Sequence, residues 1–225
     1  MTLKHHMLSL GLILAATTAQ AETFSVSLGK ITLGKLVHTG TSGGASLKAT
    51  LDNTPMGVFD GTFNGTAKPA TTTDGTAVIH YVGVSKSSRK SRSVQVQIAK
   101  GRALATDVTP ASEITNLSDP AKAPKNITDP ARAIGMLINS SGCPARINIY
   151  DGRRAIALIP DISEAKDGKL ICSIAYKVTA GPGHLSPLKI SKAKMKVTYD
   201  TTNGQSLQQI TLRSGPFNLV LDQTN

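Results

Sequence analysis

The chain has 225 residues, of which 40% are hydrophobic and 17% charged, with 20 Gly, 11 Pro, no Trp and a formal net charge of +11. This composition predicts one globular domain rich in turns. The lack of a Gly-X-Y period excludes collagen, and the recurring Val, Ile and Leu argue against a chain that is disordered throughout.

The first segment is typical of a secretory signal peptide. Lys4 precedes an apolar run from Met7 to Ala16, and the small-x-small triplet 19–21 follows. The run is shorter than the roughly 20 residues that a membrane-spanning helix needs, so we expect cleavage after Ala21 rather than a membrane anchor. The mature chain, 22–225, is then expected in the periplasm or the medium, with no integral membrane span and, because Lys4 is lost, a net charge of +10.

Alternation of apolar and polar residues predicts antiparallel strands along most of the mature chain. The inward positions of the clearest ones are Phe24, Val26 and Leu28; Ala45, Leu47, Ala49 and Leu51; Val94, Val96 and Ile98; Ile147 and Ile149; and Ala193, Met195, Val197 and Tyr199. Dipeptides that tolerate positive φ separate the strands, and we expect tight turns at each. They are Asp60-Gly61, Asn64-Gly65, Asp74-Gly75, Asp151-Gly152, Asp167-Gly168 and Asn203-Gly204.

The second half of the chain reads as a series of hairpins. The predicted strands are Arg146 to Tyr150, Arg153 to Ile159, Leu170 to Val178, Lys189 to Asp200, Gln205 to Arg213 and Phe217 to Leu221. The side-chain parity changes between Leu207 and Ile210, and this change predicts a bulge near Gln208-Gln209.

One segment between these strands lacks any period. Thr106 to Thr128 contains three prolines and many short polar residues, which predicts a long loop, either a functional cover or a disordered connection. Asp129 and Pro130 then have the residue types of an N-cap and a first helical position, so we expect a short helix at 129–139.

Taken together, these elements predict a fold that is mainly β, with one antiparallel sheet forming a curved, partly open barrel or a sandwich.

The chain has two cysteines, Cys143 and Cys172. In an exported protein such a pair favours a disulfide over a metal site or a catalytic thiol, because a redox pair would have Cys-x-x-Cys spacing. A bridge that closes about 30 residues would stabilise the fold by roughly 3 to 4 kcal/mol. We expect its role to be structural.

Several motifs of the mature chain occur together. They are the string Gly29 to Gly34, the Asp129-Pro130 helix start, Cys143 followed by Ile147 to Arg154, and Cys172 with Tyr176 and Gly181. In this combination the chain resembles an exported bacterial family catalogued as domain of unknown function 3108, whose members are uncharacterised periplasmic proteins. The resemblance implies export and a β fold, and it implies no activity because the family has no established one.

The residues give little support for catalysis. After cleavage three histidines remain, His38, His80 and His184, and they lack metal-binding spacing. The string from Gly40 to Gly44 matches the Gly-x-Ser-x-Gly pattern around Ser42, but a predicted strand follows it where a helix is needed. We therefore expect a protein that is not an enzyme, with no catalytic residues, cofactor or metal.

Positive charge gathers in two stretches that hold no Asp or Glu. The first, Gly75 to Thr106, includes an expected exposed hairpin loop, Lys86 to Arg92, and the second is Gly168 to Tyr199. The second stretch places three lysines on the outward side of one strand: Lys192, Lys194 and Lys196. Such fields attract anions, but they are also typical of solvated faces and of lysines that protect an edge strand. The candidate anion-binding residues are Arg89, Lys90, Arg92, Arg153 and Arg154.

Export narrows the anions that such a protein would meet. Nucleic acid is not expected, because the signal peptide directs the chain out of the cytosol and stacking aromatics are scarce. The leading hypothesis is a noncatalytic periplasmic β protein that binds an envelope component, an amphiphilic or anionic ligand such as a lipid, lipopolysaccharide or glycan. The alternative is a structural or interaction protein of the cell envelope, with a filled core and no small ligand, which presents its basic face to a protein partner or to the cell wall.

Overall fold

The structure is a computed structural model that describes residues 20–41, 43–54, 60–88, 90–184 and 189–224. Its strands are β1 (Gln20–Leu28), β2 (Ile31–Thr41), β3 (Gly44–Leu51), β4 (Gly61–Thr71), β5 (Ala77–Ser87), β6 (Ser91–Ala99), β7 (Arg102–Thr109), β8 (Ile127–Thr128), β9 (Ile147–Tyr150), β10 (Ala155–Lys166), β11 (Lys169–Ala180), β12 (Lys192–Asp200), β13 (Ser206–Ser214) and β14 (Phe217–Thr224). The helix α1 (Pro130–Ile138) lies between β8 and β9. The mainly β fold class is confirmed.

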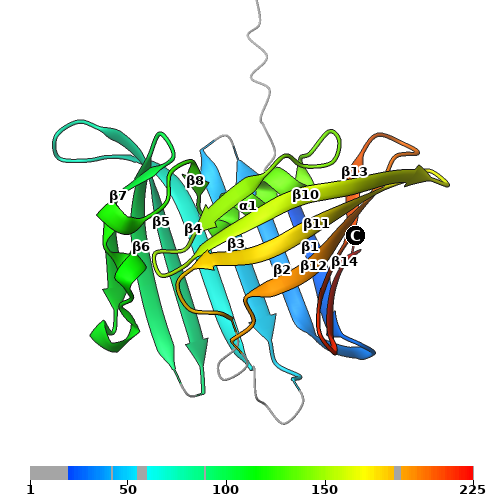
Figure 1. Ribbon diagram of the computed structural model, residues 1–225, viewed down its shortest axis with the longest axis horizontal. Helices are drawn as coiled ribbons and strands as arrows, with labels where there is room; N and C mark the ends of the chain where they lie inside the picture. The colour runs from blue at the N-terminus through cyan, green and yellow to red at the C-terminus, as the bar shows by residue number, and fades with distance from the viewer. Residues whose placement is uncertain (1–19, 42, 55–59, 89, 185–188, 225) are drawn as a thin grey trace, which may run out of the picture.

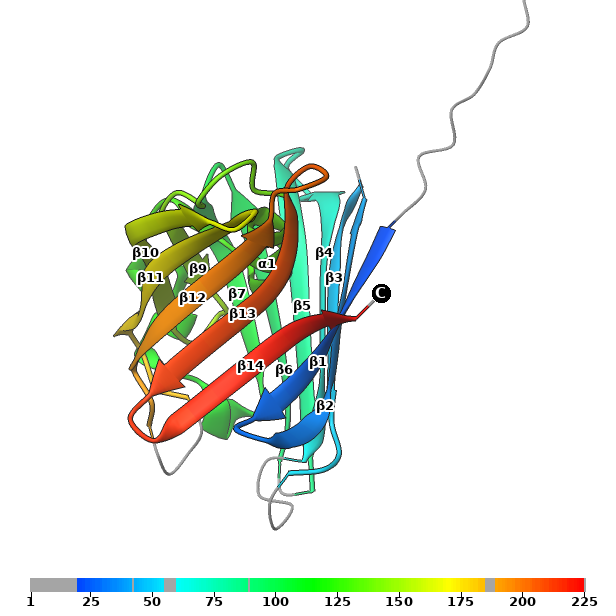
Figure 2. The same cartoon turned by 90° about the vertical axis from the view of Figure 1, so that its right-hand side faces the viewer.

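All 14 strands form one sheet that curls into a nearly closed barrel (Figure 1, Figure 2). Its order is β7-β6-β5-β4-β3-β2-β1-β14-β13-β12-β11-β10-β9-β8. The two ends of the chain meet in the middle of this order, where Thr23 of β1 pairs with Thr224 of β14. Neighbouring strands are antiparallel except β8 and β9. The unpaired edges of the sheet are therefore β7 and β8, which face each other across the gap.

The segment between β7 and β8 closes this gap. Ile127 N donates a hydrogen bond to Gly101 O at 3.1 Å, and Thr115 Oγ1 donates to Arg153 O at 2.8 Å. Ser118 Oγ donates to Gly152 O at 3.0 Å. The predicted loop, 106–128, is corrected at both ends because β7 continues to Thr109 and β8 takes 127–128. The remaining part is an ordered cover with three short 3₁₀ turns, η2 (Ala111–Glu113), η3 (Asn116–Ser118) and η4 (Pro120–Lys122).

The helix α1 lies inside one end of the barrel (Figure 1). As predicted, Asp129 caps it: the carboxylate Oδ1 accepts a hydrogen bond from Arg132 N at 2.9 Å, and Pro130 takes the first position. Small buried residues on its inner side allow the close approach, and Tyr199 Oη donates to Leu137 O at 2.8 Å. The predicted short helix is confirmed.

Two apolar clusters on either side of α1 fill the interior. One contains Phe24, Tyr199 and Leu207, and the other contains Tyr81 and Tyr150, all nearly inaccessible to solvent. Burying each such side chain stabilises the fold by roughly 1.5 to 3 kcal/mol. The middle of the barrel is therefore packed, and open space remains at its end.

The predicted bulge is present, whereas two predicted tight turns are wrong. Thr198 pairs with Gln209 while Tyr199 pairs with Leu207, which leaves Gln208 as the extra residue. Asp60-Gly61 stands at the end of the longer connection between β3 and β4, with Gly61 as the first residue of β4. Asn64-Gly65 lies inside β4, not in a turn. A Cβ at Gly65 would come 3.1 Å from the ring of Phe63, so this glycine makes room for an aromatic side chain.

The predicted signal peptide lies mostly outside the described residues, which begin at residue 20. Within them, Ala21 belongs to β1 and pairs with Thr39. No helix in the described ranges is long and apolar enough to cross a membrane.

The predicted disulfide joins Cys143, ahead of β9, to Cys172 on β11, with the Cα atoms 5.5 Å apart. Such bonds persist in oxidising compartments outside the cytoplasm. This bond ties the segment after α1 to the barrel wall, so it also fixes the open end of the barrel.

Candidate functional site

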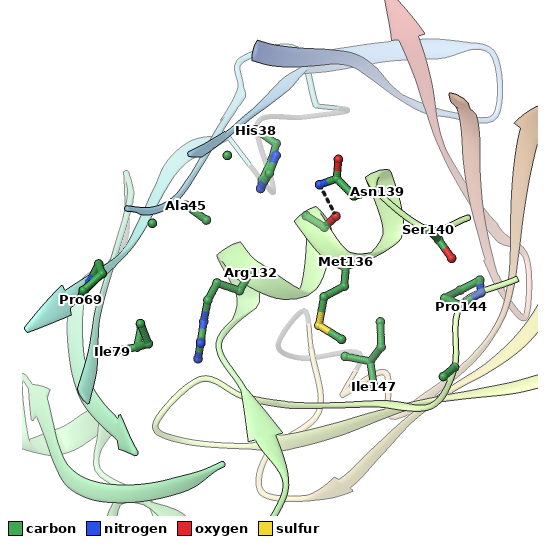
Figure 3. Close-up of a pocket in the computed structure, with 14 residues that line it drawn as sticks. His38, Ala45, Pro69, Ile79, Arg132, Met136, Asn139, Ser140, Pro144 and Ile147 are labelled. Carbon is green, nitrogen blue, oxygen red and sulfur yellow. Dashed lines mark hydrogen bonds between the residues drawn. The ribbon is translucent and has the colours of Figure 1, made fainter. Parts of the chain in front are cut away.

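A pocket of about 620 Å³ opens at the barrel end between α1 and the wall formed by β2, β3 and β4 (Figure 3). Most of its lining is apolar or small. Met136 stands 49% exposed on α1, and Ile79 and Ile147 lie on either side of the helix. This size and lining are typical of small-molecule sites.

Arg132 joins this pocket to a second one. The second pocket, about 670 Å³, is lined from the other side by residues that include Val78, Lys100 and Ile127. Both pockets share Pro69, Ile79 and Arg132. We call the two adjoining pockets the trough.

The cap of α1 positions the Arg132 side chain. Its Nε donates to Oδ2 of Asp129, a carboxylate with no exposed surface. Within the described residues, the two terminal nitrogens of the guanidinium have no hydrogen-bond or ion-pair partner. A guanidinium held at one edge leaves its outer edge free for two parallel hydrogen bonds to a carboxylate or phosphate.

His38 on β2 supplies a second polar group at the trough. Only 2% of this residue is exposed, and within the described chain its Nε2 has no hydrogen-bond partner. Burial lowers the pKa of His38, while a hydrogen bond to the Ala131 backbone and the charge of Glu22 partly oppose this effect. The ring is therefore neutral at pH 7. Because Gly135 has no Cβ, the helix can approach the ring closely: a Cβ there would lie 3.1 Å from Nε2.

The rim of the trough is held in place after the helix ends. Asn139 Nδ2 donates to Gly135 O at 2.9 Å, and Gln205 Nε2 donates to Ser140 O at 2.6 Å and to Gly142 O at 3.1 Å. The disulfide at Cys143 follows directly. The site is thus preformed, which limits the entropy lost on binding.

Three of the predicted anion-binding residues meet at one carboxylate, that of Glu113 in η2. Lys90 Nζ lies 3.0 Å from its Oε1, while Arg92 Nη1 and Arg153 Nη2 lie 3.0 Å and 2.8 Å from its Oε2. Arg153 Nε also donates to the Glu113 carbonyl. Hydrogen bonds from Lys90 and Arg92 and the charge of Arg153 lower the pKa of Glu113. We call these four residues the Glu113 network.

Arg154 forms an ion pair with Asp151. Its Nε lies 3.0 Å from Asp151 Oδ2 but is not aligned for a hydrogen bond, and its Nη1 lies 2.7 Å from His184 Nδ1. The other ring nitrogen of His184 contacts the Tyr176 hydroxyl. Burial and the charge of Arg154 lower the pKa of His184 to about 4, so the ring is neutral at pH 7 and accepts the Arg154 hydrogen bond.

The turn between β9 and β10 holds these arginines close to the barrel wall. Gly152 has φ +84°, and a Cβ there would come 2.3 Å from Val94 Cγ1, so only glycine fits. As a result Arg153 and Arg154 are buried. Lys90 is 72% exposed and, with Arg92, lines a hollow of about 290 Å³. Arg89 lies outside the described residues. Anion binding by these residues stays a prediction, and their carboxylate partners already occupy part of their capacity.

Sequence reasoning did not identify Arg132 and His38 as site residues. The signal for Arg132 was its position three residues after the N-cap Asp129, where an arginine can pair with the capping carboxylate. His38 had no comparable signal, because α1 approaches it from almost 100 positions further along the chain. Among the described residues, no group of three or more His, Cys, Asp or Glu is placed to hold a metal ion.

The sequence matches no family model and no curated protein. The resemblance to domain of unknown function 3108 is therefore not confirmed. The structure is similar to the crystal structure of a beta-barrel-like protein of domain of unknown function DUF1849 from Brucella abortus. The two share 10% sequence identity over 91% of this chain and 95% of that chain, with a TM-score of 0.45.

Proposed function

We propose that this protein is a noncatalytic binding protein of the periplasm and that the trough holds an amphiphile with one anionic group. The observation that carries the proposal is Arg132. It stands where the two pockets meet, held by Asp129 at one edge only. An arginine in this position can bind a phosphate or carboxylate through two hydrogen bonds.

The walls of the trough favour an apolar tail next to that group. Met136 is the large apolar residue of α1 that points into the pocket rather than into the core (Figure 3). Ile79 and Ile147 face the same space. A flexible thioether among aliphatic side chains adapts to ligands of variable shape. Lipids of the cell envelope combine these apolar and anionic parts, as do the acylated portions of lipopolysaccharide.

His38 adds a requirement on the headgroup. Its buried Nε2 is an acceptor in the neutral ring and has no partner among the described residues. An unpaired buried acceptor costs about 1 to 3 kcal/mol, and a ligand hydroxyl would recover this cost when the His38 ring, which lines the pocket, turns its Nε2 toward the open space. The preferred ligand therefore carries a hydroxyl group near its acid group, as glycerol phosphates and hydroxy acids do.

The alternative function, an interaction protein with a protein partner, is favoured by the packed interior. The two apolar clusters pack the interior against α1. The ligand that we propose therefore lies in the trough, which suits one acyl chain and a headgroup rather than a lipid with many chains.

The experiment compares the wild-type protein with Arg132→Ala by native mass spectrometry after gentle purification from a periplasmic extract. A titration with lysophosphatidylglycerol, which has one chain, a phosphate and hydroxyls, follows. We expect a bound anionic compound in the wild type and a Kd for the probe that is about 10- to 100-fold weaker in Arg132→Ala.

The matched control is Arg102→Ala, which removes an exposed arginine of β7 that lines neither pocket. It should keep the wild-type affinity. A clean wild-type mass together with no probe binding would overturn the trough proposal and leave the interaction protein.

A further inference from the structure

Five positive side chains lie near one another on the outer face of β11, β12 and β13, away from the end of the face where Lys169 pairs with Asp200. They are Lys177, Lys192, Lys194, Lys196 and Arg213, and all five are exposed. We call this set the lysine face. It lies on the barrel wall, apart from the residues that line the trough.

The sheet register places these charges next to one another. Lys177 pairs with Lys192 across β11 and β12, and Lys194 pairs with Arg213 across β12 and β13. Like charges in directly opposite positions destabilise a sheet. From Lys192 to Lys196 the strand advances by about 13 Å, so the five charges share a small, flat area.

No carboxylate of the described residues lies within 4.0 Å of these five cations, so none of them forms an ion pair. The carboxylate on the same face of β12, Asp200, lies four residues beyond Lys196, opposite Lys169. Four of them, Lys177, Lys192, Lys194 and Arg213, surround a hollow of about 410 Å³ that also borders Ala175. The small side chain of Ala175, opposite Lys194, leaves the centre of the face open.

The position of β12 removes the simplest structural explanation. Lysines often protect an edge strand from pairing with another chain. However, β12 lies inside the sheet between β11 and β13, and the edges are β7 and β8. The outward direction is fixed because Met195 and Val197, the alternate residues, are buried in the core.

We propose that the lysine face docks the protein onto the surface of an anionic lipid bilayer. Four of the five cations are lysines, which are flexible point charges suited to a dispersed layer of headgroups. The neighbouring outward residues, Ser173, Ala175 and Thr211, are small. Tyr176 also borders the hollow, but its hydroxyl contacts His184, so it is not a free aromatic anchor of the kind typical of a protein interface. This inference goes beyond ligand binding in the trough and does not depend on it.

Each basic residue near an anionic surface strengthens binding about fivefold. The test is sedimentation with vesicles of 30% phosphatidylglycerol in phosphatidylcholine. We expect the wild type to bind these vesicles at low salt, to lose binding as salt is added, and not to bind pure phosphatidylcholine. The triple variant K192S/K194S/K196S should bind about a hundredfold more weakly.

The matched control is K35S/K48S/K68S, which removes the same charge from exposed positions on β2, β3 and β4. Its affinity for the anionic vesicles should fall by less than about fivefold. Equal losses in both triple variants, or no wild-type binding, would overturn the proposal, because the attraction would then follow net charge alone or be absent.

Two further measurements separate a loss of vesicle binding from misfolding of the variant and from failure of the trough proposal. The lysine triple variant should melt at the wild-type temperature or above it, since it relieves like-charge pairs. If it fails to fold, Lys177→Ser with Arg213→Ser tests the same face. Arg132→Ala should bind vesicles as the wild type does, so failure of the trough proposal and failure of the lysine face give different results.

Discussion

The trough and the Glu113 network both contain buried polar groups, but these groups are paired in the network and only partly paired in the trough. In the network, one carboxylate receives Lys90, Arg92 and Arg153, and the η2 segment is thereby fastened over the gap in the barrel. In the trough, His38 Nε2 has no partner among the described residues, and Arg132 is held by one edge.

This contrast separates a structural role from a binding role. A buried charge that is fully paired stabilises the arrangement of its neighbours, whereas an unpaired buried polar group lowers stability until it gains a partner. Three of the basic residues that the sequence singles out thus pair with Glu113 over the gap in the barrel. The groups that we propose for binding, Arg132 and His38, lie outside the two basic stretches of the sequence. The predictions that follow test each side of this contrast.

The largest effect is expected from removing the disulfide that fixes the rim of the trough. Replacing both Cys143 and Cys172 by Ser should lower the free energy of unfolding by about 3 to 4 kcal/mol, because a link across 29 residues no longer restricts the unfolded chain. Urea unfolding of the wild type and the double variant measures the loss. An unchanged unfolding midpoint would refute the structural role of the bond.

Breaking the Glu113 network should have the next largest effect. Glu113→Gln leaves Arg153 buried without its carboxylate, and we expect a loss of about 2 to 3 kcal/mol in the free energy of unfolding. Lys90→Ser is the control, because Lys90 is mostly exposed and such pairs contribute less than about 1 kcal/mol. Equal losses in the two variants would show that the network does not act through the buried Arg153.

His38→Leu should change stability in the opposite direction. It removes the unpartnered nitrogen but also the hydrogen bond to the Ala131 backbone, so we expect the free energy of unfolding to rise by at most about 1 kcal/mol while probe binding in the trough weakens. Thermal unfolding and the lysophosphatidylglycerol titration measure both effects. A loss of stability would contradict the proposal that the unpaired Nε2 of His38 destabilises the unbound protein.

Much of the fold could be predicted from local patterns. The alternation in Lys192 to Tyr199 gave the correct faces of β12, and the parity change before Ile210 gave the bulge. Non-local pairing could not be predicted in this way. The pairing of Thr23 with Thr224 joins positions 201 apart in the chain, and no short pattern encodes such a partner.

The candidate site was harder to predict for the same reason. Arg153 was correctly recognised as basic, but its partner Glu113 lies 40 positions earlier, inside a loop without periodicity. His38 is on a strand whose pattern says only that it points inward, and α1 decides what it meets. Sequence patterns therefore showed which strand side chains point inward, whereas the tertiary fold determined which charged side chains are buried and which groups they pair with.

The smallest expected effect is a dependence on pH at His184, beside the Arg154 pair. Its pKa of about 4 in the folded protein is below the ordinary 6.5, so the folded state favours the neutral ring. The unfolded chain takes up a proton first as pH falls, and the stabilisation present above pH 6.5 is lost between pH 6.5 and 4. Because the ring is partly accessible, we expect a loss of about 1 kcal/mol in the free energy of unfolding.

Unfolding at pH 7 and 4.5 should show this loss in the wild type and in His80→Gln, whose ring contacts Gln95 on β6. The loss should be smaller in His184→Gln, where buried His38 still contributes a dependence of the same sign. The same pH dependence in all three proteins would assign the whole effect to His38 or to carboxylates elsewhere.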